Sequence, residues 1–148
     1  MAVQIAVIGR EECSPEEAEA AEEIGYLVAA SHGILLCGGG GGVMESACRG
    51  AREQQGTTVG ILPGRGEGNP HLDVVIRTNM GHARNVVLVE SADAVIAVGG
   101  GYGTLSEIAV ALKLEKPVFG YRTWEIDGVF RCATPGEAVL MALRAARL

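Results

Sequence analysis

The chain has few aromatic and few basic residues. Aromatic side chains make up 4% of its 148 residues, and 12 Lys and Arg stand against 18 Asp and Glu, for a formal net charge of -6. A protein that coats nucleic acid needs a basic stripe to replace the counterions of the phosphate backbone. The acidic balance therefore argues against a nucleic-acid partner, and any anion that the protein binds must be held locally.

Cysteine is also scarce and is scattered along the chain. Cys13, Cys37, Cys48 and Cys132 form no CxxC pair, and no histidine stands near them at the spacing of a zinc site. Such a distribution supports neither a metal site nor a disulfide framework. We expect reduced, mostly buried thiols and no bound metal.

Long hydrophobic runs are missing as well. The apolar segment 1–9 is too short to span a bilayer and lacks a basic lead-in. We interpret it as a first β-strand and expect a cytoplasmic protein with no membrane partner. With 48% hydrophobic residues the chain has enough apolar content for one core, so a single nucleotide- or cofactor-binding domain is expected over residues 1–148.

Glycine, by contrast, is abundant, with 22 residues, and two stretches concentrate it in the same context. Residues 34–46 read Ile-Leu-Leu-Cys-Gly-Gly-Gly-Gly-Gly-Val-Met-Glu-Ser, and residues 95–107 read Val-Ile-Ala-Val-Gly-Gly-Gly-Tyr-Gly-Thr-Leu-Ser-Glu. Each is typical of a strand, a glycine loop and a helix start, where backbone N–H groups can bind an anion. The pair predicts a phosphate site in which both loops line one crevice. The alternative is that the glycines only permit tight turns and close packing.

Neither loop matches the common nucleotide-binding motifs. No acidic residue ends the strand after the first loop, as a dinucleotide fingerprint requires, and no Lys-Ser/Thr pair makes a P-loop. The motifs alone therefore leave the identity of the ligand open.

Strands and helices alternate along the whole chain. Alternation of this kind predicts an α/β fold, a single Rossmann-like, doubly wound and mainly parallel sheet with helices on both faces. The segment Gly64–Pro70 has the composition of a mobile surface loop. Such a loop either acts as a lid or selector at the ligand site or only connects two elements. The expected strands are 3–8, 34–37, 57–62, 73–77, 94–98 and 116–121, the expected helices are 14–31, 43–55, 83–89, 104–113 and one from 134, and 124–132 is expected to be a hairpin turning at 127–128.

The second loop offers the richer set of ligand contacts. Its backbone amides are expected to cradle a phosphate, Thr104 can add a hydroxyl donor, and Tyr102 either stacks on a ring or is a plain surface aromatic. Arg84 presents a guanidinium fork that suits phosphate, although an arginine on a helix is often only a solvated charge. The first loop would line the opposite wall. The expected ligand-binding residues are Gly39, Gly40, Gly41, Gly42, Arg84, Gly100, Gly101, Tyr102, Gly103 and Thr104.

Three motifs together, Gly38–Met44, Gly81–Asn85 and Gly99–Glu107, resemble the LOG-type, "lysine decarboxylase-like" Rossmann superfamily over most of the chain. The phosphoribohydrolases of that superfamily carry Pro-Gly-Gly-x-Gly-Thr-x-x-Glu and an upstream Arg-Lys pair. Here Gly99 replaces the proline and Asn85 replaces the lysine. These departures make the chain more similar to the molybdenum cofactor carrier branch, whose members bind the pterin cofactor through its phosphate.

The resemblance implies two functions, and both stay open. The first is a carrier with molybdenum cofactor (molybdopterin) as its bound ligand. The second is a nucleoside 5′-monophosphate phosphoribohydrolase that releases base and ribose 5-phosphate, with Arg84 and Glu107 as its catalytic pair. If the protein is not a hydrolase, Glu107 would be an ordinary first-turn glutamate that complements the helix dipole. Relatives are commonly dimers or larger, so a homo-oligomer (a dimer or tetramer) is expected.

Overall fold

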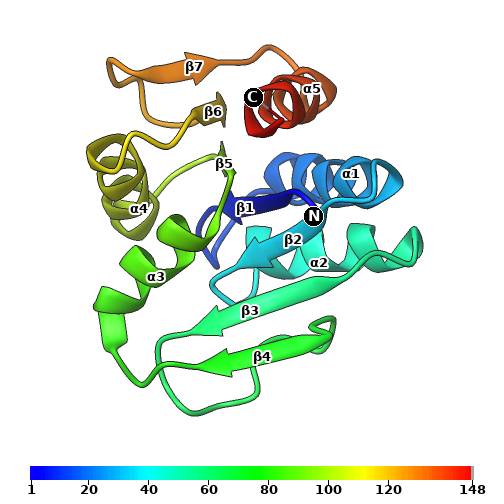
Figure 1. Ribbon diagram of the computed structural model, residues 1–148, viewed down its shortest axis with the longest axis vertical. Coiled ribbons are helices and arrows are strands. Elements are labelled where there is room, and N and C mark those ends of the chain that lie inside the picture. The colour runs from blue at the N-terminus through cyan, green and yellow to red at the C-terminus, as the bar shows by residue number, and fades with distance from the viewer. Residues whose placement is uncertain (148) are drawn as a thin grey trace.

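The computed structural model describes residues 1–147, which form one seven-stranded sheet between two layers of helices (Figure 1). The strand order is β4-β3-β2-β1-β5-β6-β7, and all neighbouring strands are parallel. The predicted doubly wound α/β fold is therefore confirmed. The elements are β1 (Gln4–Ile8), α1 (Pro15–Ala30), β2 (Ile34–Cys37), α2 (Val43–Glu53), β3 (Thr58–Leu62), β4 (Val74–Arg77), a short 3-10 helix η1 (Gly81–Ala83), α3 (Arg84–Ser91), β5 (Ala94–Val98), α4 (Tyr102–Lys113), β6 (Val118–Tyr121), β7 (Val129–Arg131) and α5 (Pro135–Ala146).

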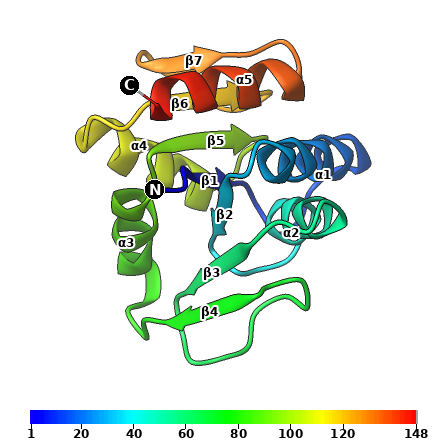
Figure 2. The same cartoon turned by 45° about the vertical axis from the view of Figure 1, so that its right-hand side comes forward.

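The sheet is covered on both faces. Helices α1, α2 and α5 pack together on one face, and α3 and α4 pack on the other, as Figure 2 shows. Alternate residues of the central strands point into the two resulting cores, with Ile5 and Val7 on the α1 side and Ala6 and Ile8 on the other. Because both faces are closed, only the edges of the sheet are open to a ligand.

Helix starts follow the signals in the sequence. The hydroxyl of Ser14 accepts a hydrogen bond from the amide of Glu17 at 3.1 Å, and the Glu17 carboxylate accepts one from the Ser14 amide at 2.8 Å. This reciprocal capping box satisfies two N–H groups that the first turn of a helix leaves free. Thr134 caps α5 by accepting a hydrogen bond from the Glu137 amide at 3.1 Å.

The predicted hairpin over 124–132 is wrong. A turn does form at Asp127–Gly128, but β7 then runs parallel to β6 rather than antiparallel to a preceding strand. Arg122 has left-handed backbone geometry (φ 52°), which turns the chain out of the sheet directly after β6. Residues 123–126 therefore form no strand.

The four thiols are free, and three of them are buried. The Sγ atoms of Cys37 and Cys48 lie 3.5 Å apart, within hydrogen-bond distance for sulfur. No helix within residues 1–147 is both long enough and apolar enough to cross a membrane. Cytoplasmic localisation stays a prediction.

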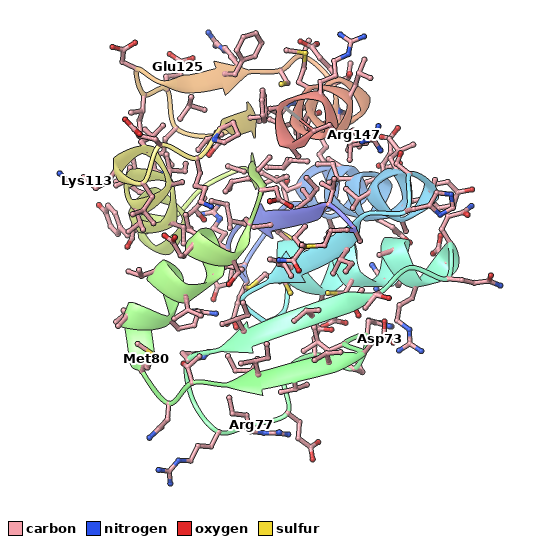
Figure 3. The ribbon with its side chains drawn as sticks, viewed as in Figure 1. Asp73, Arg77, Met80, Lys113, Glu125 and Arg147 are labelled. Carbon is pink, nitrogen blue, oxygen red and sulfur yellow. The ribbon has the colours of Figure 1, made fainter. Side chains whose placement is uncertain are left out.

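One margin of the sheet exposes apolar side chains. Val74 and Ile76 on edge strand β4 are half-exposed, as are Met80 and, on α3, Val86. Figure 3 shows Met80 at the turn that links β4 to α3, with charged Asp73 and Arg77 at the two ends of β4. Leu88 and Val89 of α3 are buried in the core instead. The homo-oligomer expected from the sequence stays a prediction.

Helices α1 and α2 touch backbone to backbone, and this contact generates a stability prediction. A Cβ at Gly25 of α1 would overlap the backbone oxygen of Ala47 in α2. Gly25→Ala must therefore push the helices apart, and we expect a loss of about 2 kcal/mol in the free energy of unfolding, in the range of overpacked cores.

The matched control is Gly136→Ala in α5, where a Cβ would meet no atom within 4 Å. That variant should gain up to about 1 kcal/mol from helix propensity. Urea unfolding followed by circular dichroism compares the two variants. Equal stability of the two alanine variants would contradict the close α1–α2 contact.

Candidate functional site

Three strand ends meet at the carboxyl edge of the sheet. The segment after β1 (Gly9–Glu11) lies between the glycine loops that follow β2 and β5, since β1 pairs with both of those strands. The direction of strand order reverses at β1 and β5, and ligands of open parallel sheets bind in the crevice at such a reversal. The fold thus brings the two glycine loops to one edge of the sheet, and a single crevice lined by both stays a prediction.

The first loop is shaped by its contact with the segment after β1. Gly42 precedes α2 with left-handed geometry (φ 61°), and a Cβ there would overlap the carbonyl oxygens of Arg10 and Glu11. The amide of Val43 donates to the Arg10 carbonyl at 3.2 Å. Arg10 and Glu11 are therefore part of the site, although the sequence analysis did not single them out. The signal was present, because Gly9 follows a strand as the loop glycines do.

A cavity of about 300 Å³ lies beside the first loop. The predicted surface loop Gly64–Pro70 forms one of its walls through Gly64, Gly66 and Gly68. The remaining lining residues are Glu11, Gly38, Gly39, Gly40, Met44, Leu62, Pro63 and Arg84.

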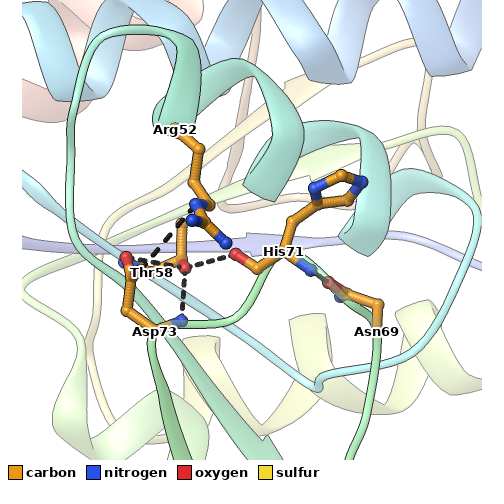
Figure 4. A network of polar contacts seen from close by, with 5 residues as sticks. All are labelled: Arg52, Thr58, Asn69, His71 and Asp73. Atoms are coloured by element: carbon orange, nitrogen blue, oxygen red, sulfur yellow. Dashed lines mark hydrogen bonds and ion pairs between the residues drawn. The ribbon is translucent and has the colours of Figure 1, made fainter.

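Asn69 fixes that surface loop to the first glycine loop. Its backbone amide donates to the Gly39 carbonyl at 2.8 Å, its side-chain amide donates to the Gly40 carbonyl at 2.9 Å, and its side-chain oxygen accepts from the His71 amide. Figure 4 shows how Thr58 and Asp73 continue this anchoring, with the Thr58 amide donating to the Asp73 carboxylate at 2.9 Å. The segment before β4 is therefore a positioned wall of the cavity.

Arg84 lies at the first loop, not at the second. Its Nη1 donates to the Gly38 carbonyl at 2.7 Å and to the Ile61 carbonyl at 3.0 Å, so it bridges the ends of β2 and β3. Its Nε is buried and has no hydrogen-bond partner within residues 1–147. Arg84 is thus a partly buried side chain that is anchored to the backbone and has a buried donor without a partner in the described chain, so it is not a fully solvated surface charge.

The second loop presents the start of α4. Gly99 has left-handed geometry (φ 62°), and a Cβ there would overlap the Glu17 carboxylate, which explains glycine in place of proline. Helix α4 begins at Tyr102, two residues earlier than predicted, and its N-cap Gly101 supplies no side-chain hydrogen bond. The first N–H groups of a helix have no partner inside the helix. Those of α4, from Tyr102 and Gly103 onward, are thus donors of the kind that bind anions at helix starts in other proteins.

A group of polar side chains is buried behind this helix start. The hydroxyl of Thr104 and the side-chain oxygen of Asn85 are both buried without a hydrogen-bond partner in the described chain. Buried polar atoms in proteins are nearly always paired, so unpaired ones call for a ligand or a water molecule. Glu107, one turn after Thr104, is only 8% exposed, and its burial raises its pKa to about 7 while Arg84 acts to lower it.

Two aromatic rings stand at the mouth of the second loop. Tyr102 is 85% exposed, and its ring centroid lies 6.3 Å from that of Trp124. The indole Nε1 of Trp124 donates to the Gly101 carbonyl at 3.2 Å. Trp124 falls in the segment predicted to be a hairpin, and nothing in the local sequence indicates that it contacts the second loop.

Comparison with known proteins places the chain in a family. The model of the SLOG cluster4 family matches residues 2–144. An uncharacterized protein of Archaeoglobus fulgidus is 48% identical over 139 residues, which cover 93% of this chain and 92% of that protein.

Two solved structures are similar over their full lengths. The molybdenum cofactor binding protein of Rippkaea orientalis is 34% identical with a TM-score of 0.93, and the alignment covers 100% of this chain and 99% of that one. The molybdenum cofactor carrier protein of Chlamydomonas reinhardtii is 32% identical, also with a TM-score of 0.93, and both chains are covered completely. The resemblance that the motifs carried is confirmed, and the chain belongs to the SLOG cluster4 family.

Proposed function

We propose that the protein is a carrier that binds molybdenum cofactor through the phosphate group of that cofactor. The observation that carries the proposal is the uncapped start of α4 with the unpaired Thr104 hydroxyl behind it. The two cofactor-binding proteins of the same fold support it.

The described residues fit such a ligand. Backbone amides of Tyr102 and Gly103 would donate to phosphate oxygens, and the Thr104 hydroxyl would add a third donor. The unused Nε of Arg84 and the open first-loop cavity leave polar partners for other parts of a large ligand. The cofactor supplies the redox-active metal, and this chain's residues bind and shield it.

Thr104 gives a clean test because its hydroxyl makes no hydrogen bond in the described chain. Thr104→Val keeps the shape and removes that donor, so the folded protein should be at least as stable as the parent while its affinity for molybdenum cofactor falls about tenfold, the loss expected for one hydrogen bond to a charged group. Cofactor released from a molybdoenzyme is titrated into the protein, and bound molybdenum is measured after gel filtration.

Ser106→Ala is the control, since that exposed serine lies on the same helix. It should bind like the parent. If Thr104→Val retains as much cofactor as the parent, the phosphate does not bind at the start of α4.

The phosphoribohydrolase is a second candidate because the fold brings Arg84 and Glu107 close enough for their charges to interact. We expect no base release from AMP, because Asn85 stands where the phosphoribohydrolase motif has lysine and Gly99 stands where it has proline. Chromatography of AMP incubated with the protein tests this. If the parent releases adenine and Glu107→Gln does not, the protein is a phosphoribohydrolase and the carrier proposal is wrong.

Burial of Glu107 also predicts a dependence of stability on pH. The folded chain binds the proton of Glu107 with a pKa of about 7, against an ordinary value of 4.5, so it holds more protons than the unfolded chain between these values. Stability contributed by this group is therefore present below pH 4.5 and is lost as the pH rises through 7. Glu107→Gln should be more stable than the parent by up to about 3 kcal/mol at pH 8 and about equal to it at pH 4.5.

Urea unfolding at the two pH values measures the difference. Glu23→Gln, which changes an exposed carboxylate on α1, is the control and should follow the parent at both. A gain for Glu107→Gln that is the same at pH 4.5 and pH 8 would contradict the buried, protonated carboxyl.

A further inference from the structure

A second cavity, of about 280 Å³, lies on the other side of the site, beside the second glycine loop. The backbone of Gly99 and Gly100 forms one wall, and the segment Arg122–Trp124 forms the other. It shares no lining residue with the first-loop cavity. A ligand with its phosphate at the start of α4 therefore has two directions in which its remainder can lie.

The indole of Trp124 is held against the second loop. Its Nε1 donates to the Gly101 carbonyl at 3.2 Å, and a Cβ at Gly100 would lie only 2.6 Å from that nitrogen. Arg122 directs the chain toward the loop through its left-handed backbone, and its guanidinium pairs with the Glu16 carboxylate. The ring is thus positioned before any ligand binds.

The two aromatic rings stand close together beside this cavity. The Tyr102 and Trp124 rings are inclined by 28° with centroids 6.3 Å apart. Aromatic faces stack on planar rings in offset as well as face-to-face arrangements. Because Tyr102 is 85% exposed, its ring is accessible to a planar ring that stacks on Trp124.

A buried polar atom lies in the same cavity wall. The Thr123 hydroxyl is buried and has no hydrogen-bond partner among the residues that the structure describes. Stacking on aromatic faces tolerates any planar ring, whereas a hydroxyl can bond to the polar edge of a heterocycle. The cavity therefore combines a stacking surface with an unused hydrogen-bonding group.

We propose that Trp124 and Tyr102 bind the planar heterocycle of the phosphorylated ligand, with the Thr123 hydroxyl at its edge. The inference rests on the proposed function, since it takes the phosphate to lie at the start of α4. On this inference, Trp124 is the residue that discriminates between ligands that carry a planar heterocycle and phosphorylated sugars that carry none.

The test uses ligands with and without a planar heterocycle. GMP carries a fused, amino- and oxo-substituted heterocycle like that of a pterin, and ribose 5-phosphate carries only its sugar. Trp124 is the only tryptophan, so its fluorescence reports on this cavity directly. We expect GMP or molybdenum cofactor to quench it, and ribose 5-phosphate to bind without quenching.

Calorimetric titration then compares the variants. Trp124→Leu should weaken binding of the ring-bearing ligand about tenfold, within the range for stacking of a base on an aromatic side chain, and leave ribose 5-phosphate within twofold. Trp124→Phe should restore most of the affinity, because it retains a ring. Tyr26→Leu on α1 is the control, since Tyr26 is 38% exposed against 37% for Trp124.

The outcomes separate this inference from the proposed function. Ring-bearing ligands that saturate the parent and Trp124→Leu with equal affinity would overturn the inference and leave the phosphate site intact. Binding of a ring-bearing ligand that leaves the fluorescence of Trp124 unquenched would likewise overturn the inference and leave the phosphate site intact. If neither GMP, molybdenum cofactor nor ribose 5-phosphate saturates the protein, both proposals fall.

Discussion

Burial of the central strands on both faces is the constraint on which the rest of the structure depends. All five residues of β5 are fully buried between the two helical layers. Each aliphatic side chain buried in this way contributes about 1.5–3 kcal/mol, so neither face can be opened to admit a ligand. Binding is confined to the edge where β1, β2 and β5 end, and every polar feature of the site lies at that edge.

At this edge, the two interpretations of the glycines, as residues that permit tight turns and as residues that line a phosphate site, do not exclude each other. Gly42 and Gly99 adopt left-handed geometry with neighbours so close that a Cβ would overlap them. Such glycines permit the tight turn from strand to helix, and the tight turn is what leaves the helix N–H groups at the surface without a capping side chain. Packing thus requires the glycines, and the free N–H groups at the helix start follow from the packing.

Local patterns in the sequence predicted the elements that depend on local chemistry. The capping box at Ser14 and the buried runs of β2 and β5 lie where they were expected. The position of Arg84 at the first loop, and that of Trp124 over the second, depend on hydrogen bonds to residues 46 and 23 positions away. Spacing along the chain carries no information on such contacts, so the positions of Arg84 and Trp124 relative to the two loops could not be predicted from it.

The protonation state of Glu107 depends on the fold and bears on the choice between a carrier and a phosphoribohydrolase. A carboxylate that stabilises positive charge on a sugar as its base departs must be ionised when substrate is bound. Burial raises the pKa of Glu107 to about 7, and a phosphate at the start of α4 adds negative charge that favours the proton further. With a pKa of about 7, Glu107 is divided between its neutral and its ionised form near neutral pH, and only the neutral form accepts a nearby anion without repulsion. Under the carrier proposal, the burial of Glu107 therefore reduces its repulsion of a phosphorylated ligand.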